Sequence, residues 1–254
     1  MKIATIYDIH ANPTAMLSVL KDIQNYEVDL IVIGGDVIAG PFPTETLTIL
    51  TEIKTPTKFI LGNAESEVIR YINGKPVNGL SNRANEEAKW VANQISSSHK
   101  TFIKNWSKTF QAVIKEVGTV LFCHATPGSD IEIFTRISSN QRILKLFDGV
   151  RASIIICGHT HMPFDLKFGK SRIINSGSVG MPFGTNQASW LLIDQQINFM
   201  TTSYDIQMAA QLISTSNYPY KESFIRNNVL NVPEEQKALN MLESMAENQE
   251  KHKL

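Results

Sequence analysis

The 254-residue sequence predicts an α/β protein with two β-sheets. Apolar runs of strand length alternate with helical patterns through the first third of the chain, which is typical of parallel strands joined by covering helices. From Phe110 onward the apolar runs are separated by short turns such as Phe168-Gly169-Lys170, which indicates antiparallel hairpins in a second sheet. No linker, internal repeat or low-complexity segment is evident, so we expect one domain over residues 1–254.

The first third supplies the clearest strand and helix signals. Asn12-Pro13 indicates a helix start, because Asn caps a helix well and Pro fits its first turn. A second helix is expected from Thr44 to Ile53. The apolar runs that read as strands are Ile3 to Tyr7, Leu30 to Ile33 and Lys58 to Leu61.

The remainder of the chain divides into three parts. A helical segment is expected near residues 66–107, with its clearest pattern from Ser81 to Ser107. A C-terminal helical tail is expected near residues 205–254, with Leu239, Leu242 and Met245 on one face. Between them lie the strand signals Ala112 to Lys115, Thr119 to Cys123, Ala152 to Cys157, Phe164 to Phe168, Arg172 to Ile174, Ala188 to Ile193 and Ile197 to Thr202.

Composition excludes several classes of protein. Lys and Arg together number 24, as do Asp and Glu, so no net basic charge favours nucleic acid or a membrane surface as partner. The sequence lacks a run of roughly 20 apolar residues that could span a bilayer. Cys123 and Cys157 are too few for a disulfide framework and fit a reducing compartment. We therefore expect a cytoplasmic protein without nucleic-acid or membrane partners. The sequence does not indicate an oligomeric state.

Five short polar clusters carry the functional argument, because each directly follows a strand signal. The carboxyl ends of strands are where ligands bind in open α/β sheets. Glycines in these clusters let the backbone turn tightly and present a side chain. The clusters are Asp8-Ile9-His10, Gly34-Gly35-Asp36, Gly62-Asn63, His124 with Ala125-Thr126-Pro127-Gly128, and Gly158-His159-Thr160-His161.

These clusters predict a transition-metal site. Four of the six histidines in the chain fall within them, beside Asp and Asn. Mixed ligation by His, Asp and Asn suits Mn, Fe, Zn, Co or Ni. Satisfied structural histidines are the alternative for any one cluster, but five clusters in this order are hard to obtain by chance.

With these residues the sequence resembles the calcineurin-like metallophosphoesterase superfamily. The family pattern is D-x-H, then G-D, then G-N-H followed by Asp or Glu, then a later His, then G-H-x-H. The resemblance spans residues 1 to about 204, includes the turn Asn175 to Gly180, and is greatest for the small bacterial and archaeal phosphodiesterase-like branch. It implies a four-layer α/β/β/α sandwich of two mixed sheets, both pointing at the site.

The resemblance also implies a role for each residue. Asp36 would bridge two divalent ions, and a hydroxide between the ions would attack phosphorus. Asp36, Asn63 and His124 are the expected catalytic residues. One ion would be held by Asp8, His10, Asp36 and His161, and the other by Asp36, Asn63, His124 and His159.

The sequence departs from the family pattern at Ala64, where the family has His. That His protonates the leaving group or steadies the transition state, which a methyl group cannot do. The site is either active without this acid, or Glu65 or His99 replaces it, or turnover is lost and a binding role remains. The Arg that follows the G-D motif in phosphoserine phosphatases is absent from Val37 to Pro41, which disfavours that activity.

The expected function is hydrolysis of a small-molecule phosphate ester by a metallophosphoesterase. A phosphodiester or nucleotide-type substrate is favoured, because such leaving groups need less help from an acid than alkoxides do. The alternative is a weak or inactive member of the fold that acts as a protein-binding scaffold. A nuclease would need a basic groove, which the neutral net charge does not indicate.

Overall fold

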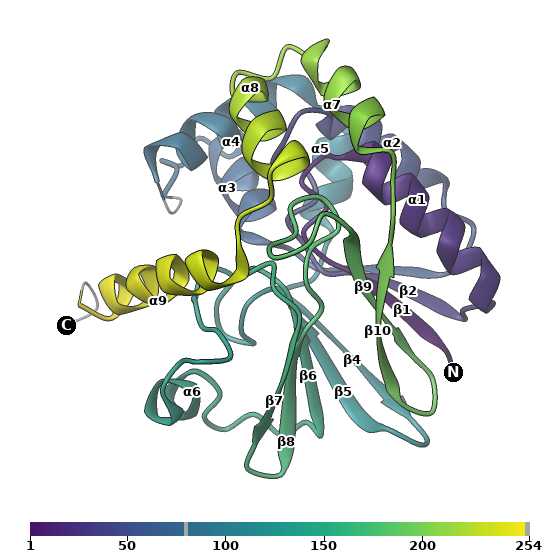
Figure 1. The fold of residues 1–254 in the computed structure, drawn as a ribbon, viewed down its shortest axis with the longest axis vertical. Coiled ribbons are helices and arrows are strands. Elements are labelled where there is room, and N and C mark those ends of the chain that lie inside the picture. The colour runs from purple at the N-terminus through teal and green to yellow at the C-terminus, as the bar shows by residue number, and fades with distance from the viewer. Residues whose placement is uncertain (79–80, 252–254) are drawn as a thin grey trace.

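Two five-stranded mixed sheets pack face to face between layers of helices (Figure 1). The computed structural model describes residues 1–78 and 81–251. This arrangement is the four-layer α/β/β/α sandwich that the resemblance implies. No helix among the described residues is long and apolar enough to cross a membrane.

The first sheet has its first strand in the middle. Its order is β10-β9-β1-β2-β3, with β1, β2 and β3 parallel and β9 antiparallel to both β1 and β10. The parallel half is the predicted βαβαβ unit, and its strands lie within two residues of the expected ranges. The strands are β1 Ile3–Ile6, β2 Leu30–Ile33, β3 Thr57–Phe59, β9 Ala188–Ile193 and β10 Ile197–Thr202.

The second sheet has the order β4-β5-β6-β8-β7. The predicted antiparallel hairpins are present at its edges, as β4–β5 and β7–β8. Its centre differs from a simple antiparallel sheet, because β6 runs parallel to both β5 and β8. The strands are β4 Thr109–Ile114, β5 Gly118–Cys123, β6 Ile154–Cys157, β7 Phe164–Phe168 and β8 Ser171–Asn175.

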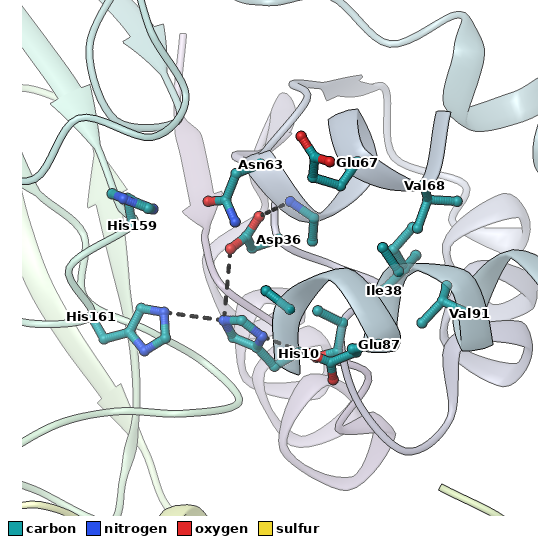
Figure 2. A pocket seen from close by; sticks show the side chains of 14 residues that line it. His10, Asp36, Ile38, Asn63, Glu67, Val68, Glu87, Val91, His159 and His161 are labelled. Carbon is teal, nitrogen blue, oxygen red and sulfur yellow. Dashed lines mark hydrogen bonds and ion pairs between the residues drawn. The ribbon is translucent and has the colours of Figure 1, made fainter. Parts of the chain in front are cut away.

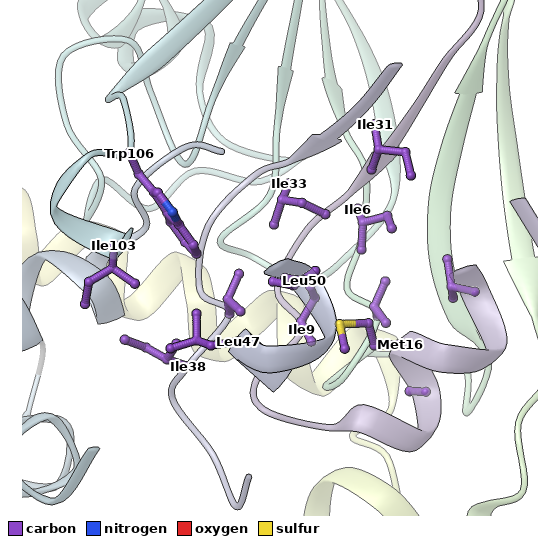
Figure 3. Close-up of a cluster of buried hydrophobic side chains, with 14 of the residues drawn as sticks. Ile6, Ile9, Met16, Ile31, Ile33, Ile38, Leu47, Leu50, Ile103 and Trp106 are labelled. Atoms are coloured by element: carbon purple, nitrogen blue, oxygen red, sulfur yellow. The ribbon is translucent and has the colours of Figure 1, made fainter. Parts of the chain in front are cut away.

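Strand residues alternate between two cores, as the period of two in a strand requires. In β2, Leu30 and Val32 face the other sheet, whereas Ile31 and Ile33 face the helices. Figure 3 shows Ile31 and Ile33 above the helical side chain Leu50. Because both faces of the central strands are covered, these strands are apolar at nearly every position.

The helices that cover the first sheet are α1 to α5. Three of them lie in the described part of the predicted helical segment near residues 66–107. The second of these three ends before Ile95, where the backbone is extended, and the Ser96 hydroxyl then caps the third. The N-terminal helix starts where Asn12-Pro13 predicts, with the Asn12 side chain accepting from the main chain of Ala15. The bounds are α1 Pro13–Ile23, α2 Pro43–Glu52, α3 Asn63–Ile72, α4 Asn82–Gln94 and α5 Ser97–Lys104, with a short 3-10 turn η1 at Gln24–Tyr26.

The later helices include one that the sequence pattern did not reveal. This short helix, α6, lies beside the second sheet and is capped by Ser139. The predicted C-terminal tail contains three α-helices and the π-helix η2 Ile225–Leu230. The α-helices are α6 Asn140–Leu146, α7 Ile206–Ser214, α8 Lys221–Phe224 and α9 Glu235–Lys251.

Helix α9 packs on the loop that precedes α6. Its residues Leu239 and Leu242 are buried against Ile133 and Met162, which is the apolar face that the sequence predicts. The buried Arg142 of α6 donates to the Ile133 carbonyl and pairs with Glu250 of α9. The C-terminal helix is therefore part of the folded structure.

We expect Leu242→Ala to lower the free energy of unfolding by about 2–4 kcal/mol, because it removes a buried side chain and leaves a cavity. Met241→Ala on the same helix is the matched control, since Met241 is 48% exposed and its truncation leaves no cavity. Urea denaturation measures both variants. Equal effects from the two substitutions would show that α9 is not docked in solution.

Candidate metal centre

The loops that follow β1, β2 and β3 meet at one edge of the first sheet, where the loops after β5 and β6 join them. Main-chain hydrogen bonds fasten the β1 loop to the β2 loop: Asp8 donates to Gly35, His10 to Asp36 and Ala11 to Val37. These three bonds place the D-x-H cluster directly beside the G-D cluster.

Two glycines allow the loops to approach so closely. At Gly62 an added Cβ would lie 2.3 Å from the main-chain nitrogen of Asp36, and at Gly158 one would lie 2.4 Å from a carboxylate oxygen of Asp8. Any side chain at either position would push a predicted ligand out of place. The sequence indicated only that these glycines let the backbone turn tightly. The structure shows that the glycines also leave room for the neighbouring ligands.

All seven predicted ligands lie in this one region, divided into two groups. In each of two triads, one ligand atom per residue lies within 4.8 Å of the other two. Asp36 is within 4.0 Å of His10 in the first triad and 3.4 Å from His124 in the second, so it lies between them. The triads are Asp8, His10 and His161, and Asp36, His124 and His159.

Asn63 is the seventh of these residues and joins the second triad. Its side-chain amide lies 3.1 Å from Nε2 of His124. The same amide is also within hydrogen-bonding distance of Asp36 and of a ring nitrogen of His159. An amide oxygen turned toward these groups would complete a set of ligands around a cation.

Three of the histidines are held in one tautomer by the main chain. Nδ1 lies 3.0 Å from the Ala39 carbonyl in His10, 2.9 Å from the Gly34 carbonyl in His124 and 2.9 Å from the Met181 carbonyl in His161. A carbonyl oxygen only accepts, so each Nδ1 carries the proton. When the rings are neutral, each Nε2 therefore presents a lone pair to the site, which is the arrangement found in metal-binding histidines.

Several polar atoms of the site lack a partner without a cation. Nε2 of His10 lies 3.0 Å from Nε2 of His161, and neither neutral ring has a proton there to share. Oδ1 of Asp8 and Nε2 of His159 are buried and have no hydrogen-bond partner. Buried polar atoms normally find partners. A divalent cation in the first triad would satisfy the unpartnered atoms of Asp8, His10 and His161, so these residues fit an ion of the kind that the family pattern implies.

The surroundings lower the pKa of two of the histidines and raise the pKa of a third. Burial lowers the pKa of His10 and of His159 to about 4, so both rings are neutral and ready to bind a cation at pH 7. Burial also opposes protonation of His124, but the charge and hydrogen bonding of Asp36 outweigh it and raise the pKa of His124 to about 10. Asp36 and His124 thus form an ion pair when no metal is bound.

Glu65 has a structural role. Its carboxylate accepts hydrogen bonds from the main-chain nitrogens of Asp36, Val37 and Ile38 at 2.8–3.2 Å, and from that of Gly62 at 2.9 Å. It is completely buried. With its oxygens occupied in this way it fixes the β2 loop to the start of α3. Glu65 is therefore not positioned to replace the missing acid at residue 64.

Ala64 lies in the wall of a pocket that residues of both triads also line. Figure 2 shows this pocket. Its main-chain nitrogen donates to Oδ1 of Asp36 at 2.9 Å. His99, the other replacement considered from the sequence, lies on α5 and is not part of this wall. Instead, Glu67 and Glu87 line the pocket, and sequence reasoning did not single them out. Glu67 follows Ala64 by three residues on α3, a spacing that could have indicated a shared helix face.

Comparison with known proteins agrees with this fold. Residues 1–197 match the calcineurin-like phosphoesterase superfamily domain, and the chain belongs to that superfamily. Family members typically use dinuclear metal centres, which the two triads resemble. The chain is therefore a member of the metallophosphoesterase class of proteins.

Individual proteins are similar to this chain in sequence or in fold. The chain is 28% identical over 238 residues to an uncharacterized protein of Methanocaldococcus jannaschii, covering 85% of this chain and 93% of that protein. The crystal structure of a metallophosphoesterase from Sphaerobacter thermophilus is similar in fold, with a TM-score of 0.71 and 23% identity over 91% of this chain and 100% of that chain. A hypothetical protein from Pyrococcus horikoshii has a TM-score of 0.78 at 15% identity, over 91% and 99% of the two chains.

We expect metal binding at pH 7.5 to release a proton from His124. The raised pKa of His124 means that the ring is protonated below about pH 10, and its Nε2 can bind a cation only after that proton leaves. Apparent affinity should therefore rise about tenfold per pH unit between pH 7 and 9. Calorimetric titration with Mn²⁺ in buffers of different ionisation enthalpy measures the release. His99→Gln, outside the site, should behave like the wild type; a pH-independent affinity would contradict the expectation.

Proposed function

We propose that this protein is a metal-dependent phosphoesterase that hydrolyses a small-molecule phosphodiester or nucleotide-type phosphate. The observation that supports this most directly is the pair of buried triads with Asp36 between them. We further propose that Asp8, His10, Asp36, Asn63, His124, His159 and His161 hold two divalent ions drawn from Mn, Fe, Zn, Ni and Co.

Each side chain would have a defined task in this reaction. Bound ions would neutralise phosphoryl charge and lower the pKa of a water molecule. Asp36, placed between the triads, would keep the two ions together. The ring of His124, held by the Gly34 carbonyl, would keep its Nε2 aimed at an ion. Asn63 would contribute an uncharged ligand at the entrance to α3.

Two separate pockets beside the triads favour a diester. One is lined by residues of both triads, among them His10 and His159, together with Ala64 and α4. The other is lined by His124, Lys108 and the loop from Thr126 to Asp130. The two share no lining residue. A phosphodiester has two organic groups, and one could occupy each pocket while the phosphate lies at the triads.

Ala64 is the observation that favours a second candidate function. A site without the family His could retain its fold and serve as a protein-binding scaffold. The ligands favour catalysis, since a scaffold has no physical need for seven converging metal-binding side chains.

The two cysteines are free and buried, in keeping with the cytoplasmic location that we propose.

We expect metal-stripped protein to regain hydrolysis of bis-p-nitrophenyl phosphate when Mn²⁺, Ni²⁺, Co²⁺ or Zn²⁺ is added. Asp36→Asn should reduce kcat at least about 100-fold, because it removes the charge shared by both triads. Asp29→Asn, an exposed Asp far from the site, is the matched control. Two bound ions with no turnover of any diester would favour the scaffold.

We expect Ala64→His to increase hydrolysis of phenyl phosphate by about 10-fold or more, and that of p-nitrophenyl phosphate much less. An added imidazole can protonate a poor leaving group, and general acid help is worth roughly 10²–10⁴-fold when well placed. Ala64→Gln adds a side chain of similar length without an acid and is the control. Equal gains for both substrates would mean that the imidazole does not act as an acid.

A further inference from the structure

The pocket that residues of both triads line together with Ala64 is large enough for a small organic group of a substrate. Its cavity of about 230 Å³ is smaller than the roughly 300–1,000 Å³ pockets of drug-sized ligands but larger than the roughly 150 Å³ cavity that can hold benzene. Figure 2 shows His10, Asp36 and His161 on one side and Ile38, Val68 and Val91 on the other. A group attached to a phosphate at the triads could therefore extend directly into it.

The far wall is made of aliphatic side chains from three segments. Ile38 comes from the loop after β2, Val68 from α3, and Val91 from α4. Ala84 and Ala88 of α4 widen the space, because their side chains end at Cβ. Ala64 does the same on α3, where a longer side chain would project into the pocket. Such a surface gains free energy by removing apolar groups from water.

The charged groups of this wall are carboxylates. Glu67 accepts from the main-chain nitrogen of Asn78 at 2.5 Å, and its other oxygen lies 3.7 Å from Nε of Arg70. Glu87 accepts from the hydroxyl of Tyr218. These three partners hold the two carboxylates in place. Among the described residues, the lining includes neither Lys nor Arg, so this pocket has no side chain to neutralise a second phosphate.

We infer that this pocket binds an uncharged, largely apolar organic group of the phosphate ester and excludes groups that carry further negative charge. The inference rests on the proposed function and narrows its substrate class. Small aryl or alkyl esters fit the wall, whereas a polyphosphate chain would meet Glu67 and Glu87. Like charges held close in a partly dry site repel strongly.

Phosphonates test this without turnover, because their carbon–phosphorus bond is not hydrolysed. Calorimetry on the Mn²⁺-loaded protein would compare methylphosphonate, benzylphosphonate and 4-carboxybenzylphosphonate. We expect benzylphosphonate to bind at least about 10-fold more tightly than methylphosphonate, from the apolar area it buries. The added carboxylate should cost at least about 10-fold, since it enters the pocket near Glu67.

Two variants assign these effects to the pocket. Ala84→Leu fills it from a half-buried position and should reduce the preference for benzyl over methyl to less than about threefold. Lys89→Leu adds the same side chain to an exposed position on α4 and should leave the preference unchanged. Glu67→Gln should recover most of the affinity for 4-carboxybenzylphosphonate and leave methylphosphonate binding unaltered.

The possible outcomes separate this inference from the proposed function. Equal binding of benzyl- and methylphosphonate, or a preference that survives Ala84→Leu, overturns the inference even if diesters are hydrolysed. A preserved preference without hydrolysis of any diester overturns the proposed function and supports the pocket assignment. Failure of every phosphonate to bind the metal-loaded protein overturns both.

Discussion

The hydrogen bonds from Nδ1 of His10, His124 and His161 to main-chain carbonyls determine what the rest of the site can do. Each bond sets the tautomer and the ring orientation together, so that three Nε2 atoms face inward. The carbonyls belong to the loops at Gly34, Ala39 and Met181, and the loops are themselves placed by the sheet. The two sheets therefore position the loops, and the loops orient these rings.

Holding the ligands in this way requires unusual backbone conformations. Five of the seven predicted ligands adopt a positive φ, between 48° and 67°: Asp8, His10, Asp36, His159 and His161. Residues other than glycine are uncommon in this region, and strain of this kind gathers at functional sites. The network around Glu65 opposes the strain at Asp36 by tying its nitrogen to the start of α3.

The sequence predicted the ligand clusters well because strand ends are a local signal. A short apolar run followed by Gly, Asp, Asn or His is visible without knowing the partners of the strand. The role of Glu65 was missed, although its position three residues after Gly62 is the spacing of a capping box. Helix α6 is too short for a periodic pattern. The pocket between α3 and α4 could not be predicted, because its walls come from Ile38, Val68 and Val91, which are distant along the chain.

Because β1 lies in the middle of the first sheet, its two strand partners become available at different times during synthesis. Its neighbour on one side is β2, which follows shortly in the sequence, but its neighbour on the other is β9, at residues 188–193. During synthesis, β1 keeps one open edge until about three quarters of the chain has been made. Such distant pairing is slow to form. Because His159 and His161 also come late, a nascent chain that has not reached them would offer a metal ion only part of the proposed site.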